Sequence, residues 1–196
     1  MSDPRRSLAI ALLILGGAIA TWGAYIPVKA ALAQTLLERA WLRVQNGEAN
    51  ARPWPWADMF PLAEIEFPTL RKRVIVLEGA SGEAMAFGPG HMPNTPEIGA
   101  HGMAIVAAHR DTQFNELGTL KIGDEIVAVT RDGKRTSFRV SEIGVAKANV
   151  SGLDPADGGP TGVRLALVTC YPFEGVLHSP LRYVVIADKR ITENPR

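Results

Sequence analysis

Residues 165–170 read Leu-Ala-Leu-Val-Thr-Cys, and Tyr171-Pro172 follows them. A short apolar run closed by proline is typical of a buried β-strand, because proline cannot donate a ladder hydrogen bond. The run ends on Cys170, the only cysteine in the chain, so no intrachain disulfide is possible. A lone cysteine is either a small buried hydrophobe or a reactive thiol. The stretch therefore predicts a strand that ends in one candidate nucleophile.

Further short runs on both sides of this strand predict a β-rich body over residues 57–196. The runs with a strand-like pattern cover 62–67, 73–77, 103–108, 125–130, 136–145 and 181–187. Turn residues separate them, and Asp132-Gly133 is a strong hairpin signal. One short helical turn is expected at 114–120. About seven short strands with little helix predict a closed barrel or a sandwich.

Composition narrows the class of protein. The chain has 196 residues, 46% of them hydrophobic, and a formal net charge of +1. Such a chain can bury a core and is long enough for one domain with an appendage, which argues against global disorder. Acidic and basic residues are mixed without a basic block, which argues against nucleic acid as the main partner.

The N-terminal segment, residues 1–29, predicts a transmembrane signal-anchor. Leu8–Ile26 carries no charge, and its roughly 19 residues would span ~28 Å as a helix, close to the ~30 Å hydrocarbon core. Arg5 and Arg6 precede it, so the positive-inside rule puts the rest of the chain outside the cytoplasm. The alternative is a signal peptide cleaved after Ala31-Leu32-Ala33. Both alternatives export the domain.

Residues 30–56 predict a helix followed by a stiff linker. Apolar residues recur at helical spacing over 30–46, namely Leu32, Leu36, Leu37, Ala40, Trp41 and Val44. The helix could lie along the membrane or pack on the domain. Residues 53–56 read Pro-Trp-Pro-Trp, which predicts an extended segment because each proline restricts its own φ and its predecessor. We expect its tryptophans to cap the barrel wall, with ligand stacking as the alternative.

Two more residues join Cys170 as candidates for chemistry. His109 stands at the end of the buried run 103–108, where a rigid strand can present a side chain to a cleft. Arg182 lies on the run after Cys170, and the two would be close if these strands are antiparallel neighbours. The other histidines, at 91, 101 and 178, are expected to be loop or surface residues.

Together these three groups suit acyl transfer. A protonated imidazole stabilises a thiolate and later gives its proton to a leaving amine. A guanidinium stays charged and can bind a developing oxyanion through two donors. Taken singly, each residue has a structural alternative, since a cysteine in an apolar strand is usually core and an arginine on a strand usually faces solvent.

Ordered motifs resemble those of the sortase family of cysteine transpeptidases. Residues 167–170 resemble the signature strand that ends in the cysteine, and 181–185 resemble the arginine strand. Residues 109–114 resemble the histidine segment of the class D and Gram-negative types. Residues 86–92, and the anchor followed by 53–58, resemble the Gram-negative branch, class GN. The resemblance covers nearly the whole chain.

This resemblance implies a fold and a reaction. The expected fold is a closed sortase β-barrel of about eight strands. Cys170 would attack a carbonyl in the C-terminal sorting motif of a secreted protein, with His109 as proton donor and Arg182 as oxyanion-binding cation. An amine acceptor of the cell envelope would resolve the thioester. Thr169 is expected to bind substrate or orient the nucleophile, and neither cofactor nor metal is implied.

A few positions bear on that expectation. Ala108 stands where the family usually has glycine, and Ser179 replaces the usual glycine before the arginine strand. Leu167 replaces a threonine and is expected to point into the core. Asp111 is expected to pair with Arg110 or cap a turn, and not to complete a catalytic triad.

Two other functions fit the same residues. A cysteine endopeptidase or amidase would use water as acceptor, and an anchored binding module would have no chemistry. The expected location is the inner membrane, as a single-pass protein with its catalytic domain on the periplasmic side.

Overall fold

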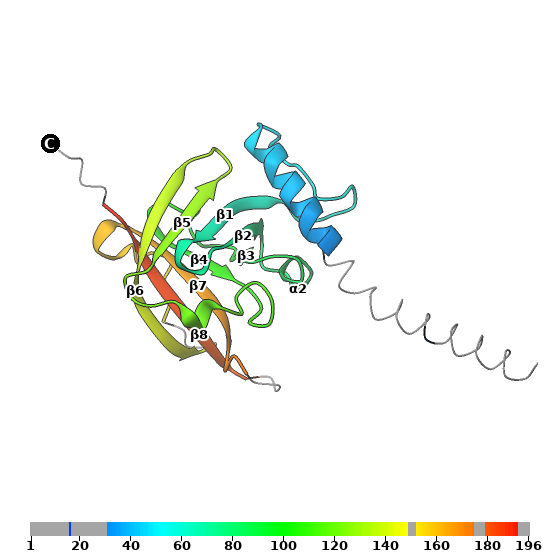
Figure 1. Ribbon diagram of the computed structural model, residues 1–196. Coiled ribbons are helices and arrows are strands. Elements are labelled where there is room, and N and C mark those ends of the chain that lie inside the picture. Colours follow the sequence, from blue (N-terminus) through cyan, green and yellow to red (C-terminus); the bar gives the residue numbers. More distant parts are fainter. Residues whose placement is uncertain (1–15, 17–30, 149–151, 175–178, 192–196) are drawn as a thin grey trace, which may run out of the picture.

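The computed structural model describes residues 16, 31–148, 152–174 and 179–191 and contains a closed barrel in the order β1-β2-β3-β4-β7-β8-β6-β5 (Figure 1). The strands are β1 (Pro61–Phe67), β2 (Lys72–Glu78), β3 (Gly90–His91), β4 (Gly102–Ala107), β5 (Glu125–Thr130), β6 (Arg135–Lys147), β7 (Val163–Tyr171) and β8 (Leu181–Lys189). The barrel is confirmed over the sandwich, and every predicted strand is present. The sequence pattern missed β3, because two residues are too short to show a period.

In the part of the chain that the structure describes, four short helices lie between the strands. They are η1 (Pro68–Leu70), α2 (Gly82–Met85), η2 (Leu117–Thr119) and η3 (Gly159–Thr161). The turn predicted at 114–120 corresponds to η2. The hairpin predicted at Asp132-Gly133 joins β5 to β6, with Gly133 at a φ of 76°. Glycine suits that left-handed conformation because it has no Cβ to clash.

Strand direction decides which ends of the sheet meet. Most neighbouring strands are antiparallel, but β2–β3 and β4–β7 are parallel. The β4–β7 register runs from Gly102 opposite Val163 to Ala107 opposite Val168. Because these two strands point the same way, the residues that follow them emerge at the same edge. His109 and Cys170 are therefore neighbours in the fold, although 60 residues of sequence separate them.

The core fills the barrel interior. Along β7, Leu165 and Leu167 are 0% exposed and Thr169 is 2% exposed, as expected for alternate side chains on the inner face. Leu167 thus points into the core, as predicted. Phe114 and Phe138 are also fully buried in this cluster.

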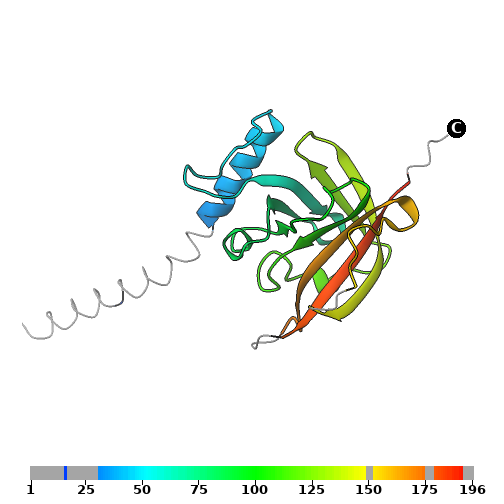
Figure 2. The same cartoon turned by 180° about the vertical axis from the view of Figure 1, so that it is seen from behind.

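Residues 31–45 form a helix that packs on the outside of the barrel beside β1 and β2 (Figures 1 and 2). Its buried stripe consists of Ala33, Leu37, Ala40, Trp41 and Val44. Leu37 contacts a cluster with Leu77, and Trp41 contacts another with Val129. The helix is confirmed and packs on the domain. The predicted stripe is confirmed at Leu37, Ala40, Trp41 and Val44, but Leu32 is 57% exposed and Ala33 is buried in its place.

The Pro-Trp segment turns instead of running extended, so that prediction was wrong. The Ala57 amide donates to the Trp54 carbonyl at 3.0 Å and closes a turn. Trp54 packs edge-on against Phe87 with ring centroids 5.0 Å apart, so this tryptophan does cover the barrel wall. Trp56 is 79% exposed and covers nothing.

The described residues contain no helix long and apolar enough to cross a membrane. Apart from Gly16, the predicted anchor over residues 8–26 lies outside the described residues.

Candidate active site

Cys170 and Arg182 meet through strand register. They are direct partners in the antiparallel pair β7–β8, and both side chains are partly exposed. Directly opposite residues of an antiparallel pair project from the same face, with Cβ atoms roughly 5 Å apart. Arg182 Nη1 donates to the carbonyls of Ser179 and Leu181, each at 2.9 Å. Within the described part of the chain, no carboxylate forms an ion pair with Arg182.

His109 follows the last ladder bond of β4. The Ala108 amide donates to the Val168 carbonyl at 3.1 Å, and the chain then turns away from β7. The His109 carbonyl accepts from the amides of Thr112 and Phe114, and Phe114 is buried, which anchors the turn in the core. The His109 side chain is left exposed at the mouth of the site.

One groove contains these side chains. It has a volume of about 490 Å³, and its lining comprises Met85, Ala107, Ala108, His109, Arg110, Asp111, Val168, Thr169, Cys170, Ser179 and Arg182. All four residues named from the sequence as site candidates therefore line the same groove. It holds a thiol, an imidazole and two guanidinium groups, one of which is paired with Asp111. Such a set can stabilise a thiolate and an oxyanion.

Thr169 lies behind the cysteine and uses its hydroxyl inside the protein. Thr169 Oγ1 donates to the Ala108 carbonyl at 2.8 Å. This bond joins the residue before Cys170 to the residue before His109. A role for Thr169 in binding substrate stays a prediction.

Arg110 is a groove residue with one contact that sequence reasoning did not anticipate. Its Nη1 donates to the Pro172 carbonyl at 2.6 Å, and its Nε donates to Asp111 Oδ1 at 3.3 Å. The pairing with Asp111 was predicted and is confirmed. The contact with Pro172 was missed because it crosses 62 positions of sequence, and no local pattern signals it.

The other histidines differ from His109. His91 belongs to strand β3 and not to a loop as predicted, although its side chain packs on a loop, with Nε2 2.8 Å from the Pro96 carbonyl. His101 is exposed just before β4 begins, at the other end of that strand from His109. His178 lies outside the described residues. No group of three or more histidine, cysteine or acidic residues gathers as a metal site in the described ranges.

A family model agrees with this geometry. The Sortase domain model matches residues 65–190, which is more than half of the chain. The match includes His109, Thr169, Cys170 and Arg182, and it leaves out the helix of residues 31–45. The chain belongs to the sortase family. Members of this family are cysteine transpeptidases.

Individual sortases resemble the chain to different degrees. Sortase D of Bacillus subtilis is 29% identical over 128 residues, which cover 65% of this chain and 63% of that protein. A sortase E variant from Streptomyces avermitilis is 28% identical, with a TM-score of 0.55 over 67% of this chain and 88% of its own. The Clostridium perfringens sortase D5 transpeptidase, at 19% identity, shares the fold, with a TM-score of 0.62 over 82% of this chain and 99% of its own. The class GN assignment within the family stays a prediction.

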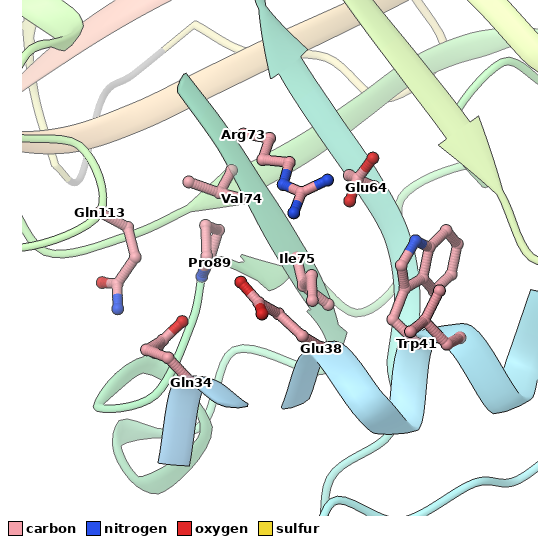
Figure 3. Close-up of a pocket in the computed structure, with 10 residues that line it drawn as sticks. Gln34, Glu38, Trp41, Glu64, Arg73, Val74, Ile75, Pro89 and Gln113 are labelled. Atoms are coloured by element: carbon pink, nitrogen blue, oxygen red, sulfur yellow. The ribbon is translucent and has the colours of Figure 1, made fainter. Parts of the chain in front are cut away.

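This sortase has a second hollow outside the groove. It lies between the helix of residues 31–45 and β2, where Glu38, Glu64, Arg73 and Trp41 line it (Figure 3). Partial burial raises the pKa of Glu64, and the nearby Arg73 opposes that shift. The hollow has charges of both signs and no thiol, so it does not compete with the groove as an acyl-transfer site.

Proposed function

We propose that this sortase is a membrane-anchored transpeptidase in which Cys170 is the nucleophile, His109 the proton donor and acceptor, and Arg182 the oxyanion-binding cation. The observation that supports the proposal is the presence of all three side chains in one groove, with Cys170 opposite Arg182 in the sheet register. A reactive cysteine needs a cationic, accessible setting, and this one has it.

The proposed reaction has two halves. The Cys170 thiolate attacks a substrate carbonyl, and Arg182 binds the resulting oxyanion. The C–N bond breaks as the His109 imidazolium gives its proton to the leaving amine, which leaves a thioester on Cys170. In the second half, an acceptor amine attacks the thioester and loses a proton to His109. The products are a new amide and the original imidazolium–thiolate pair.

The proposed substrate is a secreted protein with a C-terminal sorting signal, and the proposed acceptor is an amine of the cell envelope. The Leu8–Ile26 segment would hold the enzyme in the inner membrane with the groove on the periplasmic side. Intact-mass measurement of the membrane-extracted protein tests the anchor. A mature chain that begins at Gln34 would instead reveal a cleaved signal peptide.

A trapping experiment tests the chemistry. Purified enzyme is incubated with a library of peptides that resemble C-terminal sorting signals, with and without hydroxylamine. We expect a thioester on the parent protein, release of a peptide hydroxamate, and neither product from Cys170→Ala. Hydrolysis that ignores added amine would identify an endopeptidase. Equal peptide binding by parent and Cys170→Ala, without any product, would identify a binding module.

A further inference from the structure

Among the described residues, two side-chain hydrogen bonds connect the end of β4 to the end of β7, one on either side of the His109–Cys170 pair. On one side, Thr169 donates to Ala108, so the residues that precede Cys170 and His109 are joined. On the other side, Arg110 donates to Pro172, so the residue after His109 is joined to the segment just after Cys170. Both candidate catalytic residues therefore lie between two cross-links.

The Arg110 side chain that makes the second cross-link is nearly buried and has two hydrogen-bond partners. Its side chain is only 11% exposed, and its guanidinium is held by a carbonyl at 2.6 Å and by the Asp111 carboxylate at 3.3 Å. A guanidinium is planar and permanently charged, so two partners fix both its position and its orientation. Hydrogen bonds from a charged donor are also stronger than neutral ones.

Main-chain pairing alone does not hold the two segments at this point. The β4–β7 register ends at Ala107 opposite Val168, and in the described residues the last ladder bond runs from the Ala108 amide to Val168. Beyond it the His109 segment turns away, while β7 continues to Tyr171 beside β8. Side-chain bonds therefore help to set the separation of the His109 and Cys170 backbones, and Arg110 supplies one beyond the pair.

We propose that Arg110 is a positioning residue for acyl transfer: through Pro172 it fixes the spacing between the imidazole of His109 and the thiol of Cys170. This inference rests on the proposed function. Proton transfer and thiolate stabilisation both require close contact between these groups, and a misplacement of about 1 Å can cost about 10²-fold in rate. Loss of the Arg110 contact should lower kcat, because Arg110 positions His109 and Cys170 and is not proposed to bind the substrate.

The test compares Arg110→Met with Arg110→Lys. Methionine keeps an apolar stem but donates nothing, whereas lysine can still make one charged bond to the Pro172 carbonyl. We expect Arg110→Met to lower kcat about 10²-fold with KM little changed, and Arg110→Lys to recover at least about tenfold of that loss.

Arg131→Met is the matched control. Arg131 also donates to a proline carbonyl, that of Pro61 at 2.9 Å, and pairs with a carboxylate, that of Glu78 at 2.8 Å. It does not line the groove. A general loss of stability would affect both methionine variants, whereas a loss of positioning would lower kcat in Arg110→Met alone.

Alkylation of Cys170 by iodoacetamide gives a second readout that needs no substrate, because the chain has one cysteine. We expect Arg110→Met to slow alkylation at neutral pH as His109→Ala does, and Arg131→Met to leave it unchanged. Parent-like kcat and alkylation in Arg110→Met, together with inactive Cys170→Ala and His109→Ala, would overturn the positioning role and leave the proposed function intact. A rise in KM at unchanged kcat would also overturn it. Product formation by Cys170→Ala would overturn the proposed function itself.

Discussion

Cys170 and Arg182 are cross-strand partners in the antiparallel pair β7–β8. The two residues sit on rigid strands, so their separation is set by the sheet and not by a loop. Arg182 Nη1 donates to the carbonyls of Ser179 and Leu181, which fixes one end of the guanidinium.

We predict that Arg182→Lys loses much of the turnover and that Arg182→Ala loses somewhat more. A guanidinium offers two parallel donors to an oxyanion, whereas an ammonium offers one mobile contact. The expected loss in kcat for such a donor is roughly 10²–10³-fold, with KM changed much less. The measurement is steady-state kinetics with a peptide substrate that the trapping experiment identifies.

Other results would assign Arg182 differently. Variants within about twofold of the parent rate would make it a structural residue of the barrel rim. A large rise in KM at unchanged kcat would make it a substrate-binding residue.

His109→Ala should slow acylation by about 10²–10⁴-fold, the usual range for a positioned acid–base group. His91→Ala and His101→Ala are the controls, since neither residue lines the groove. Single-turnover formation of the thioester isolates the step. Damage from either control that equals the damage from His109→Ala would show that the histidine assignment is wrong or incomplete.

Thr169→Val should destabilise the domain more than Thr169→Ser. Valine removes the donor and leaves the Ala108 carbonyl without its 2.8 Å partner, whereas serine keeps the hydroxyl. A buried acceptor that loses its hydrogen bond costs about 1–3 kcal/mol in the free energy of unfolding. Urea denaturation measures the difference, and equal stability of the two variants would show that the bond contributes little.

Trp41→Ala should destabilise the domain strongly, because the helix of residues 31–45 is part of the fold. Trp41 is 5% exposed, and truncation of such a core side chain costs about 3–5 kcal/mol. Leu42→Ala is the control on the same helix, since Leu42 is 61% exposed and its loss should change stability by less than about 0.5 kcal/mol. Equal melting temperatures for Trp41→Ala and the parent protein would show that packing of this helix contributes little to stability.

Glu64→Gln should raise stability at neutral pH. Partial burial raises the folded-state pKa of Glu64 above its ordinary value of 4.5, so ionisation of this carboxyl weakens the folded state. Its stabilising contribution is complete below the unfolded pKa and is lost as the pH rises through the folded pKa. The gain from glutamine should therefore vanish in acid, as thermal melts at several pH values would show.

Glu66→Gln is the control for that change. Glu66 accepts two bonds from Arg135, at 3.1 and 2.8 Å, so its neutral replacement should lose up to about 1 kcal/mol at neutral pH. Stabilisation by Glu66→Gln at pH 7, or a gain from Glu64→Gln that persists in acid, would contradict the prediction.

The amino-acid sequence by itself determined most of the strands and the identity of the candidate nucleophile. Alternation and turn signals are local, so β5, β6 and the Asp132-Gly133 turn could be located from neighbouring residues alone. The single cysteine at the end of an apolar strand needed no partner to be recognised as a candidate. The helix at 31–45 was visible for the same reason, and so was most of its buried face. The exposure of Leu32 was not, because burial at the end of the helix depends on where the barrel wall lies.

Only the tertiary structure decided which strand ends meet. The parallel pairing of β4 with β7 brings His109 to Cys170, and no local period encodes a pairing between strands so far apart in sequence. The same holds for Arg110, whose neighbour Asp111 suggested a surface ion pair while its contact with Pro172 lies 62 positions away. Side chains that act across strands become visible only when the register is known, because register is set by the packing of the whole barrel.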